Sequence, residues 1–280
     1  MEHSKVIPSG PIVITGASGG MGSAATRTLA SKGIPIIMAC RDIDKAEEIK
    51  SKIIKDFPKA DLTVMEIHLE SFASIKTFAE GLKGVELAGL FNNAGVLPKH
   101  YTLSEEGYEL SMAVNYLGPW LLTSLLLPQL KDNAAVVNMV SISSDIAHFS
   151  EDILHRKTKH FHRINRYATS KLALTYFTMI LAERHPNLRV NASDPGIVNT
   201  DMIRMDMWFD PLTDVLFRPF CNTPDQGVSP ALAALLGDRT GCLYSGKKAR
   251  PFPGKFASHH DDALRLWNIT EREMIDNKVL

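Results

Sequence analysis

Thr15-Gly16-Ala17-Ser18-Gly19-Gly20-Met21-Gly22 is the stretch of sequence that decides the fold. It follows an apolar, β-branched run and precedes a helical pattern, which is the context that a dinucleotide-binding turn requires. Glycine lets the backbone approach a pyrophosphate closely, and the helix N-terminus presents unpaired N–H groups and a partial positive charge. A tight turn without a ligand is the alternative, and the context favours binding. The predicted cofactor contacts are Gly16, Ser18, Gly19, Gly20, Met21 and Gly22.

The alternation of a short apolar run with an amphipathic stretch repeats along the chain, with no low-complexity linker between copies. It predicts an α/β fold: a single-domain, Rossmann-type, doubly wound parallel sheet of about seven strands with helices on both faces. The expected strands are Ile12 to Thr15, Ile34 to Ala39, Leu62 to Ile67, Leu87 to Phe91, Ala135 to Val140, Arg189 to Ser193 and Cys242 to Tyr244. The expected helices are Gly20 to Ser31, Asp44 to Lys55, Ser71 to Gly81, Glu105 to Leu117, Pro119 to Leu130, Arg166 to Arg184 and Pro224 to Leu236.

Composition argues against several classes of protein. The chain has 31 basic and 31 acidic residues, so no net field attracts nucleic acid, and we expect no nucleic-acid partner. Its three cysteines are widely separated and form no C-x-x-C pair, which fits a reducing, cytoplasmic location. Met1 to Pro8 lacks the apolar core of a signal peptide. Trp120 to Leu130 is shorter than the about 20 residues that a membrane span needs, so we expect no transmembrane segment.

The end of the second expected strand reads Met38-Ala39-Cys40-Arg41-Asp42. A cofactor without a 2′-phosphate is usually held at this position by an acidic residue. The guanidinium of Arg41 instead matches a phosphate in charge and in fork geometry. A solvated Arg41 with Asp42 as a helix N-cap is the alternative. The arginine favours NADP(H) over NAD(H).

Tyr167-Ala168-Thr169-Ser170-Lys171 places an ammonium beside a phenol, because residues four apart share one face of a helix. A free phenol with a pKa of about 10 is a weak base at neutral pH, and a neighbouring cation favours the phenolate. Tyr167 could then exchange a proton with a substrate oxygen. The spacing alone is common on ordinary helices, so its meaning depends on the accompanying motifs.

Those motifs resemble the short-chain dehydrogenase/reductase family over about Pro11 to Ser245, and an amphipathic tail follows. Ala39-Cys40-Arg41-Asp42 and the segment from Val140 to His148 are most similar to its retinol-dehydrogenase-like branch. The resemblance implies hydride transfer between nicotinamide and a carbonyl or alcohol, with Tyr167 as acid/base and Lys171 contacting both Tyr167 and the cofactor ribose. Tyr167 and Lys171 therefore also count as predicted cofactor contacts.

The resemblance implies two further catalytic residues. The family serine, which hydrogen-bonds the reacting oxygen, falls on Ser144 by family register, with Ser141 and Ser143 as alternatives. The family asparagine, which holds a water joined to the lysine, falls on Asn115, for which a structural role competes. The N-N-A-G and P-G-x-V-x-T motifs add cofactor contacts at Asn93, Ala94, Gly95, Pro195, Gly196, Val198 and Thr200.

Three departures from the family pattern concern the surroundings of this site. His68, before Leu69, stands where the family often has an adenine-contacting Asp, so either the imidazole or the backbone makes that contact. The basic insertion near 148–166 is interpreted as a solvated flap, as a selector of anionic substrates or, least favoured, as a metal site. The apolar segment near 200–223, which includes Trp208, is interpreted as a substrate cover or as core.

We therefore predict an NADP(H)-dependent oxidoreductase whose substrate is a medium or bulky apolar aldehyde, ketone or alcohol, such as a retinoid-, steroid- or lipid-like molecule. Ser144 and Trp208 are the predicted substrate contacts, and no metal is expected. The alternative function is a catalytically idle NADP(H)-binding redox sensor or interaction module. We expect a small-molecule substrate as the partner. A homodimer is possible, because Leu121 to Leu127 offers an apolar surface for pairing, and a monomer is the alternative.

Overall fold

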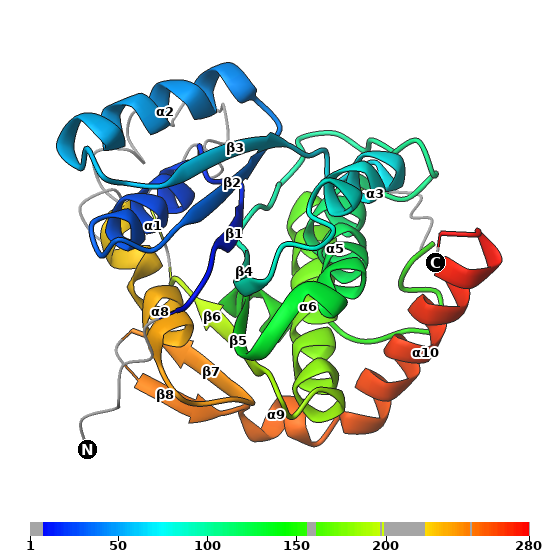
Figure 1. The fold of residues 1–280 in the computed structure, drawn as a ribbon. Helices are drawn as coiled ribbons and strands as arrows, with labels where there is room; N and C mark the ends of the chain where they lie inside the picture. Colours follow the sequence, from blue (N-terminus) through cyan, green and yellow to red (C-terminus); the bar gives the residue numbers. More distant parts are fainter. Residues whose placement is uncertain (1–7, 156–160, 197, 199–221, 247, 280) are drawn as a thin grey trace, which may run out of the picture.

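The computed structural model describes residues 8–155, 161–196, 198, 222–246 and 248–279, and these form one α/β domain. Its centre is an eight-stranded sheet in the order β3-β2-β1-β4-β5-β6-β7-β8, which confirms the doubly wound prediction (Figure 1). The first seven strands pair in parallel, and β8 pairs antiparallel with β7. Sequence analysis did not predict β8. The strands are β1 Ile12–Thr15, β2 Ile36–Cys40, β3 Leu62–Glu66, β4 Leu87–Asn92, β5 Leu130–Met139, β6 Arg189–Asp194, β7 Cys242–Ser245 and β8 Lys248–Pro251.

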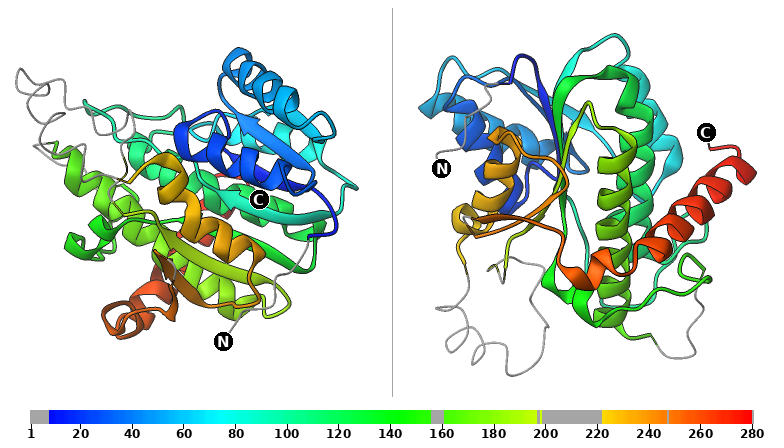
Figure 2. Two further views of the ribbon diagram at one scale, coloured as in Figure 1. Left: turned by 90° about the vertical axis from the view of Figure 1, so that its left-hand side faces the viewer. Right: turned by 90° about the horizontal axis from the view of Figure 1, so that it is seen from below.

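Helices cover both faces of the sheet, as Figure 2 shows in its right-hand view. One face carries α1 (Gly20–Ala30), α2 (Ile43–Asp56) and α8 (Pro224–Leu236), and the other carries α3 (Phe72–Gly81), α5 (Gly118–Leu126) and α6 (Arg163–Arg184). Alternate strand residues enter the two cores: in β1, Ile12 and Ile14 belong to the first and Val13 to the second. β1, β2 and β4 are buried along their whole length, which explains why they are almost continuously apolar, whereas β3 and β8, at the two edges of the sheet, are more exposed.

The chain from 110 to 129 is one helical run rather than the two expected helices. It comprises α4 (Leu110–Met112), a π-helical turn (Ala113–Leu117), α5 and a short 3-10 turn (Leu127–Gln129). It begins at Leu110 and not at Glu105, because the Glu109 carboxylate accepts the N–H groups of Ser111 and Met112 and caps the helix there. Among the described residues this is the one run with the length and apolarity of a membrane span, and 78% of its apolar window is buried inside the fold.

The amphipathic tail forms α9 (Gly254–Ala257) and α10 (His260–Asp276), and α10 packs on the outer side of α6 (Figure 1). Trp267 stacks on Phe177 with a 5.6 Å separation of ring centroids, and the Arg184 guanidinium lies 4.6 Å from the Trp267 ring. Farther along, the Tyr116 and Thr270 hydroxyls hydrogen-bond at 2.6 Å. This third layer buries apolar surface of α6. The expected dimer surface is also largely internal, since Leu121, Leu122 and Leu126 are buried.

Candidate active site

Two positions of the glycine-rich turn between β1 and α1 accept only glycine. Gly16 has a φ of +65°, in the left-handed region, and donates its N–H to Ala39 at 2.8 Å. A Cβ on Gly22 would lie 2.1 Å from the Gly16 carbonyl oxygen, so the helix can pack this closely on the turn only without a side chain. No side chain caps the N-terminus of α1, which leaves its first N–H groups available to an anion.

A cavity of about 640 Å³ opens beside this turn, at the carboxyl ends of the strands. Of the predicted cofactor contacts, its lining contains Gly16, Ser18, Gly19, Gly20, Met21, Gly22, Arg41, Leu69, Asn93, Ala94 and Gly95. The structure thus brings together residues from four separate segments of the chain. The lining also contains residues that sequence analysis did not single out, including Lys45 and Arg163.

The structure shows a feature of each interpretation of the end of β2. Arg41 lines the cavity, and Asp42 caps α2 by accepting the Lys45 N–H at 2.9 Å. Capping turns the chain so that Arg41 and Lys45 reach the same cavity. These two cations, the glycine cradle and the free N–H groups of α1 are the donor set that a phosphorylated dinucleotide needs, so the residues present fit such a cofactor.

The His68 imidazole does not line the cavity that the described residues form. Its ring contacts two carboxylates, Glu66 at 3.0 Å and Glu70 at 3.6 Å. Ile67 and Leu69, its neighbours, do line the cavity. The His68 backbone is engaged as well: its N–H donates to the Ser74 hydroxyl at 2.9 Å, and its carbonyl accepts the Ser71 N–H at 3.1 Å.

Tyr167, Lys171 and Asn115 meet between α6, β5 and the π-helical turn. The Lys171 ammonium donates to the Met139 carbonyl at 2.7 Å and lies 5.7 Å from the Tyr167 ring centroid. The Asn115 amide donates to the Val96 carbonyl at 2.9 Å, and its carbonyl oxygen accepts the Val96 N–H at 2.7 Å. A Cβ on Gly95 would lie 3.3 Å from Asn115 and 3.4 Å from Lys171, so this loop borders both groups. The predicted helix-face pair and the distant asparagine therefore share one site.

Three serines of the loop after β5 take different positions. The Ser144 hydroxyl is buried and donates to the Ser141 carbonyl at 2.8 Å, within the 3-10 turn Ile142–Ile146. Ser143 donates its hydroxyl to the Ser141 hydroxyl at 3.0 Å. Of the three, Ser141 is the serine whose hydroxyl acts on Tyr167, where its hydrogen bonding lowers the pKa of the phenol. The structure therefore brings Ser141, an alternative in the sequence analysis, to the tyrosine, and it turns Ser144 toward its own loop.

Burial dominates the electrostatics of the site. It raises the pKa of Tyr167 to about 12; the Ser141 hydrogen bond opposes this rise, and the charge of Asp194 adds to it. Burial also lowers the pKa of Lys171 to about 8. The neighbouring cation was expected to make the phenol more acidic, whereas in the structure burial is the largest influence on Tyr167 and favours the neutral phenol.

The loop after β6 lies next to the same centre. Gly196 has a φ of +69° and donates its N–H to the Asp194 carboxylate at 3.0 Å. The Asn222 amide donates to the Pro195 carbonyl at 3.0 Å, and Val198 is buried against α8. Thr200 and Trp208 lie outside the described residues, as does most of the segment near 200–223.

In the described part of the basic insertion, His155 contacts the C-terminal helix α10. The His155 imidazole contacts the Glu273 carboxylate at 3.0 Å, and the Tyr108 hydroxyl donates to the same carboxylate at 2.6 Å. His155 and Tyr108 also lie ring against ring, with centroids 5.3 Å apart. Within the described residues, no group of three His, Cys, Asp or Glu side chains is placed to hold a metal ion.

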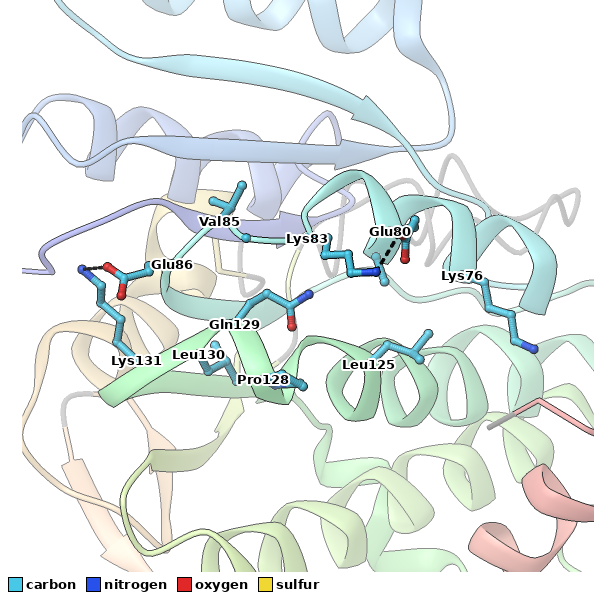
Figure 3. Close-up of a pocket in the computed structure, with 12 residues that line it drawn as sticks. Lys76, Glu80, Lys83, Val85, Glu86, Leu125, Pro128, Gln129, Leu130 and Lys131 are labelled. Carbon is cyan, nitrogen blue, oxygen red and sulfur yellow. Dashed lines mark hydrogen bonds and ion pairs between the residues drawn. The ribbon is translucent and has the colours of Figure 1, made fainter.

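A second cavity, of about 600 Å³, lies at the opposite, amino-terminal end of the sheet (Figure 3). Four of its charged lining residues are paired with each other, Lys83 with Glu80 at 3.2 Å and Lys131 with Glu86 at 3.0 Å, and Lys76 donates to the Lys278 carbonyl at 3.2 Å. It contains none of the predicted site residues. The chemistry-bearing side chains therefore gather at the other end of the sheet.

Comparison with known proteins agrees with this geometry. The family model described as short chain dehydrogenase matches residues 11–207. Human retinol dehydrogenase 12 is 35% identical over 274 residues, which are 94% of this chain and 86% of that protein. Human retinol dehydrogenase 13 is 31% identical, over 95% of this chain and 85% of its own length.

Solved structures show the same fold. An uncharacterized protein from Mycobacterium paratuberculosis aligns with a TM-score of 0.77 and 29% identity, over 94% of this chain and 92% of the other. A Shigella flexneri protein described as a short chain dehydrogenase and complexed with NADP aligns with a TM-score of 0.66 and 23% identity, over 86% and 98%. The chain belongs to the short-chain dehydrogenase family, in its retinol-dehydrogenase-like branch, and is an oxidoreductase acting on CH–OH or C=O groups.

Proposed function

We propose that this chain is an NADP(H)-dependent reductase of medium or bulky apolar aldehydes and ketones. The observation that carries the proposal is the convergence of Ser141, Tyr167 and Lys171 at the carboxyl end of β5, next to the cavity that starts at the glycine-rich turn. The cofactor supplies the hydride when bound, and the protein supplies orientation and proton transfer.

The roles of the side chains follow from their contacts. The Ser141 hydroxyl, which lowers the pKa of the neighbouring Tyr167, would hydrogen-bond the carbonyl oxygen of the substrate and polarise it. Tyr167 would donate its proton to that oxygen as the carbon is reduced. Lys171, held by the Met139 carbonyl, would stabilise the phenolate that remains. Asn115 keeps the loop that contains Gly95 and Val96 beside the lysine.

Two cations support the preference for NADP(H). Arg41 and Lys45 line one end of the cavity, and both side chains belong to exposed residues. Within the described part of the chain, neither makes a salt bridge that would neutralise it. An extra phosphate on the cofactor would find two available positive charges there, with a planar fork from Arg41.

The apolar character of the substrate is supported by the surface around the site, which we call the apolar rim (Tyr101, Leu103, Ile142, Ile146 and Ile164). These are five of the six large apolar side chains that are exposed in the described residues. Ile142 and Ile146 are 62% and 59% exposed, and both belong to the turn that follows Ser141. The loop that carries Tyr101 and Leu103 joins the start of α6, where Tyr101 packs edge-on against Phe161 at 5.8 Å. Exposed apolar side chains on the turn that follows Ser141 are typical of the entrance for an apolar ligand.

Turnover of the purified protein tests the function. We expect NADPH oxidation with apolar aldehydes or ketones from a panel graded in chain length and ring size, and no turnover by Tyr167→Phe, which should still bind NADPH. Ser141→Ala and Ser144→Ala are a matched pair: the first should lose kcat by about 100-fold or more and the second should retain most of it. NADPH binding by the wild type with no turnover across the panel would instead indicate the idle sensor.

Cofactor preference is tested by changing the two cations. Arg41→Ala should raise KM for NADPH by about tenfold or more and leave KM for NADH nearly unchanged, since an Arg–phosphate contact contributes about 1.5–3 kcal/mol. Lys45→Ala should act in the same direction. Lys52→Ala is the control, because Lys52 lies on α2 away from the cavity and pairs with Glu48 at 2.6 Å. An equal effect of Arg41→Ala on both cofactors would contradict the preference.

A further inference from the structure

Arg163 is a cation that lines the cavity beside the glycine-rich turn, and the proposed function does not use it. It is the first residue of α6, and its Nη2 donates to the Leu97 carbonyl at 3.3 Å. Within the described residues its Nε is buried without a hydrogen-bond partner, and its guanidinium forms no salt bridge. The acidic residues that line the cavity in the same part of the chain, Asp42 and Glu70, contact other groups. Arg163 therefore keeps its positive charge and several N–H donors for a ligand.

The position of Arg163 on α6 brings it to the reacting centre. Arg163, Tyr167 and Lys171 follow one another at intervals of four residues, so they share one face of the helix. The loop after β4 lies along that face: a Cβ on Gly95 would lie 3.4 Å from the Lys171 ammonium, and Leu97 contacts Arg163. Arg163 therefore lies one helical turn from Tyr167, on the side opposite to Lys171.

The negative charges of the cofactor have other donors. The glycine-rich turn and the N-terminus of α1 suit a pyrophosphate, and Arg41 and Lys45, near the end of β2, suit a 2′-phosphate. In the sheet, β1 separates β2 from β4, whose loop contacts Arg163. Arg163 also belongs to α6, which covers the opposite face of the sheet from α1 and α2 (Figure 2). The anion that best matches Arg163 is therefore a group of the substrate.

Apolar side chains lie on both sides of Arg163 along the chain. Ile164, the next residue, is 55% exposed and belongs to the apolar rim. Phe161, two residues before Arg163, packs edge-on against Tyr101 of the same rim, with ring centroids 5.8 Å apart. The cation therefore borders an apolar surface, and a ligand that meets both should combine an apolar body with a negative group.

We propose that Arg163 is a specificity-determining residue that binds a carboxylate of the substrate, so that this reductase acts on apolar aldehydes or ketones that also carry an acidic group. The inference rests on the proposed function and agrees with one interpretation of the basic insertion, a selector of anionic substrates. The planar guanidinium forms paired N–H···O bonds with a carboxylate and balances its charge, while the apolar rim covers the hydrocarbon between the acid and the carbonyl. The carboxylate orients the carbonyl toward Tyr167 and is released unchanged.

Paired substrates test this assignment: a straight-chain aldehyde with a carboxylate at its far end, and the methyl ester of the same molecule, over a graded series of chain lengths. The wild type should show a kcat/KM for the acid about tenfold or more above that for the ester at the best length, mainly through KM. Arg163→Gln removes the charge, and the acid-to-ester ratio should fall to about one. Arg163→Lys keeps the charge without the planar fork, so its ratio should be intermediate.

A matched control and a binding measurement accompany these assays. Arg265→Gln removes an arginine of α10 whose side chain is 61% exposed and lies outside the lining of the cavity, so its ratio should match the wild type. A saturated straight-chain carboxylate of the same series, which has no aldehyde to reduce, should bind the NADP+-loaded wild type about tenfold or more tightly than Arg163→Gln, by titration calorimetry. If the Gln variant loses cooperative melting, the wild-type ratio and the Lys variant still provide the test.

The results distinguish this proposal from the function on which it rests. Equal kcat/KM of the wild type for acid and ester would overturn the role of Arg163, and so would a loss of the preference in Arg265→Gln, because the effect would then belong to surface charge in general. Weaker NADPH binding by Arg163→Gln, measured by nucleotide fluorescence, with an unchanged ratio would also overturn it, because the arginine would then hold a cofactor phosphate. Failure of the wild type to reduce any carbonyl compound would contradict the proposed function instead, and the calorimetry would still decide whether Arg163 binds a carboxylate.

Discussion

Replacement of Lys171 by Met should stabilise the protein at neutral pH while it abolishes turnover. The Lys171 ammonium is fully buried, and burial lowers its pKa from 10.5 to about 8. At about 1.4 kcal/mol per pH unit, that change costs the folded state about 3 kcal/mol when the lysine is protonated. Removal of its hydrogen bond to the Met139 carbonyl, 2.7 Å long, costs about 1–3 kcal/mol. Since Met has a similar shape, the net gain at pH 7 is about 1 kcal/mol.

The pH dependence gives the sharper test, since the two contributions differ in sign. Below pH 8 both the folded and the unfolded chain hold the Lys171 proton, so the full cost is present. Between pH 8 and 10.5 the unfolded chain binds more protons than the folded chain, so the wild type gains stability as pH rises. Lys171→Met has no such titration, and it should become the less stable of the two proteins near pH 10.5.

Urea unfolding of both proteins between pH 7 and 10.5, with kcat measured on the same samples, provides the data. The free energy of unfolding of the wild type, relative to the variant, should rise by about 3 kcal/mol across that range. A difference that does not change with pH would refute the reasoning, because the buried ammonium would then not be the source of the cost.

Three other substitutions test the turn, the outer helix layer and a buried ion pair. Gly22→Ala should abolish NADPH binding, seen by nucleotide fluorescence, because its Cβ would lie 2.1 Å from a carbonyl oxygen; Gly254→Ala, where nothing lies within 4 Å, is the control. Trp267→Ala should lower the free energy of unfolding by about 3–5 kcal/mol in urea titrations, since it removes the ring that joins α10 to α6. Arg166→Met should cost about 3 kcal/mol by the same measurement, because it leaves Glu109 buried without its cation, 3.5 Å away; a change below 1 kcal/mol would show that the pair is not needed.

The sequence predicted the elements whose geometry is local. A strand, a glycine-rich turn and a helix in succession have few ways to pack, so residues 12–22 indicated both the fold and the cavity. Tyr167 and Lys171 share a face because a helix repeats every 3.6 residues, whatever surrounds it. Arg41 could be predicted as a site residue because the carboxyl ends of parallel strands meet at one edge of the sheet. By contrast, β8 and α10 are partly polar and had no local motif to mark them.

Tertiary structure decided which of several similar groups meets the reacting centre. Family register pointed to Ser144 rather than Ser141 or Ser143, but the direction of each hydroxyl follows from the winding of the 3-10 turn after β5. His68 occupies the expected position, but its ring contacts Glu66 and Glu70 and does not line the cavity. β5 and β6 are distant in the chain, and only their register, in which Met139 pairs with Ser193, brings the loop that contains Ser141 beside the turn at Pro195 and Gly196. Spacing along a helix or turn is encoded locally, whereas the orientation and proton affinity of a buried side chain depend on every segment packed around it.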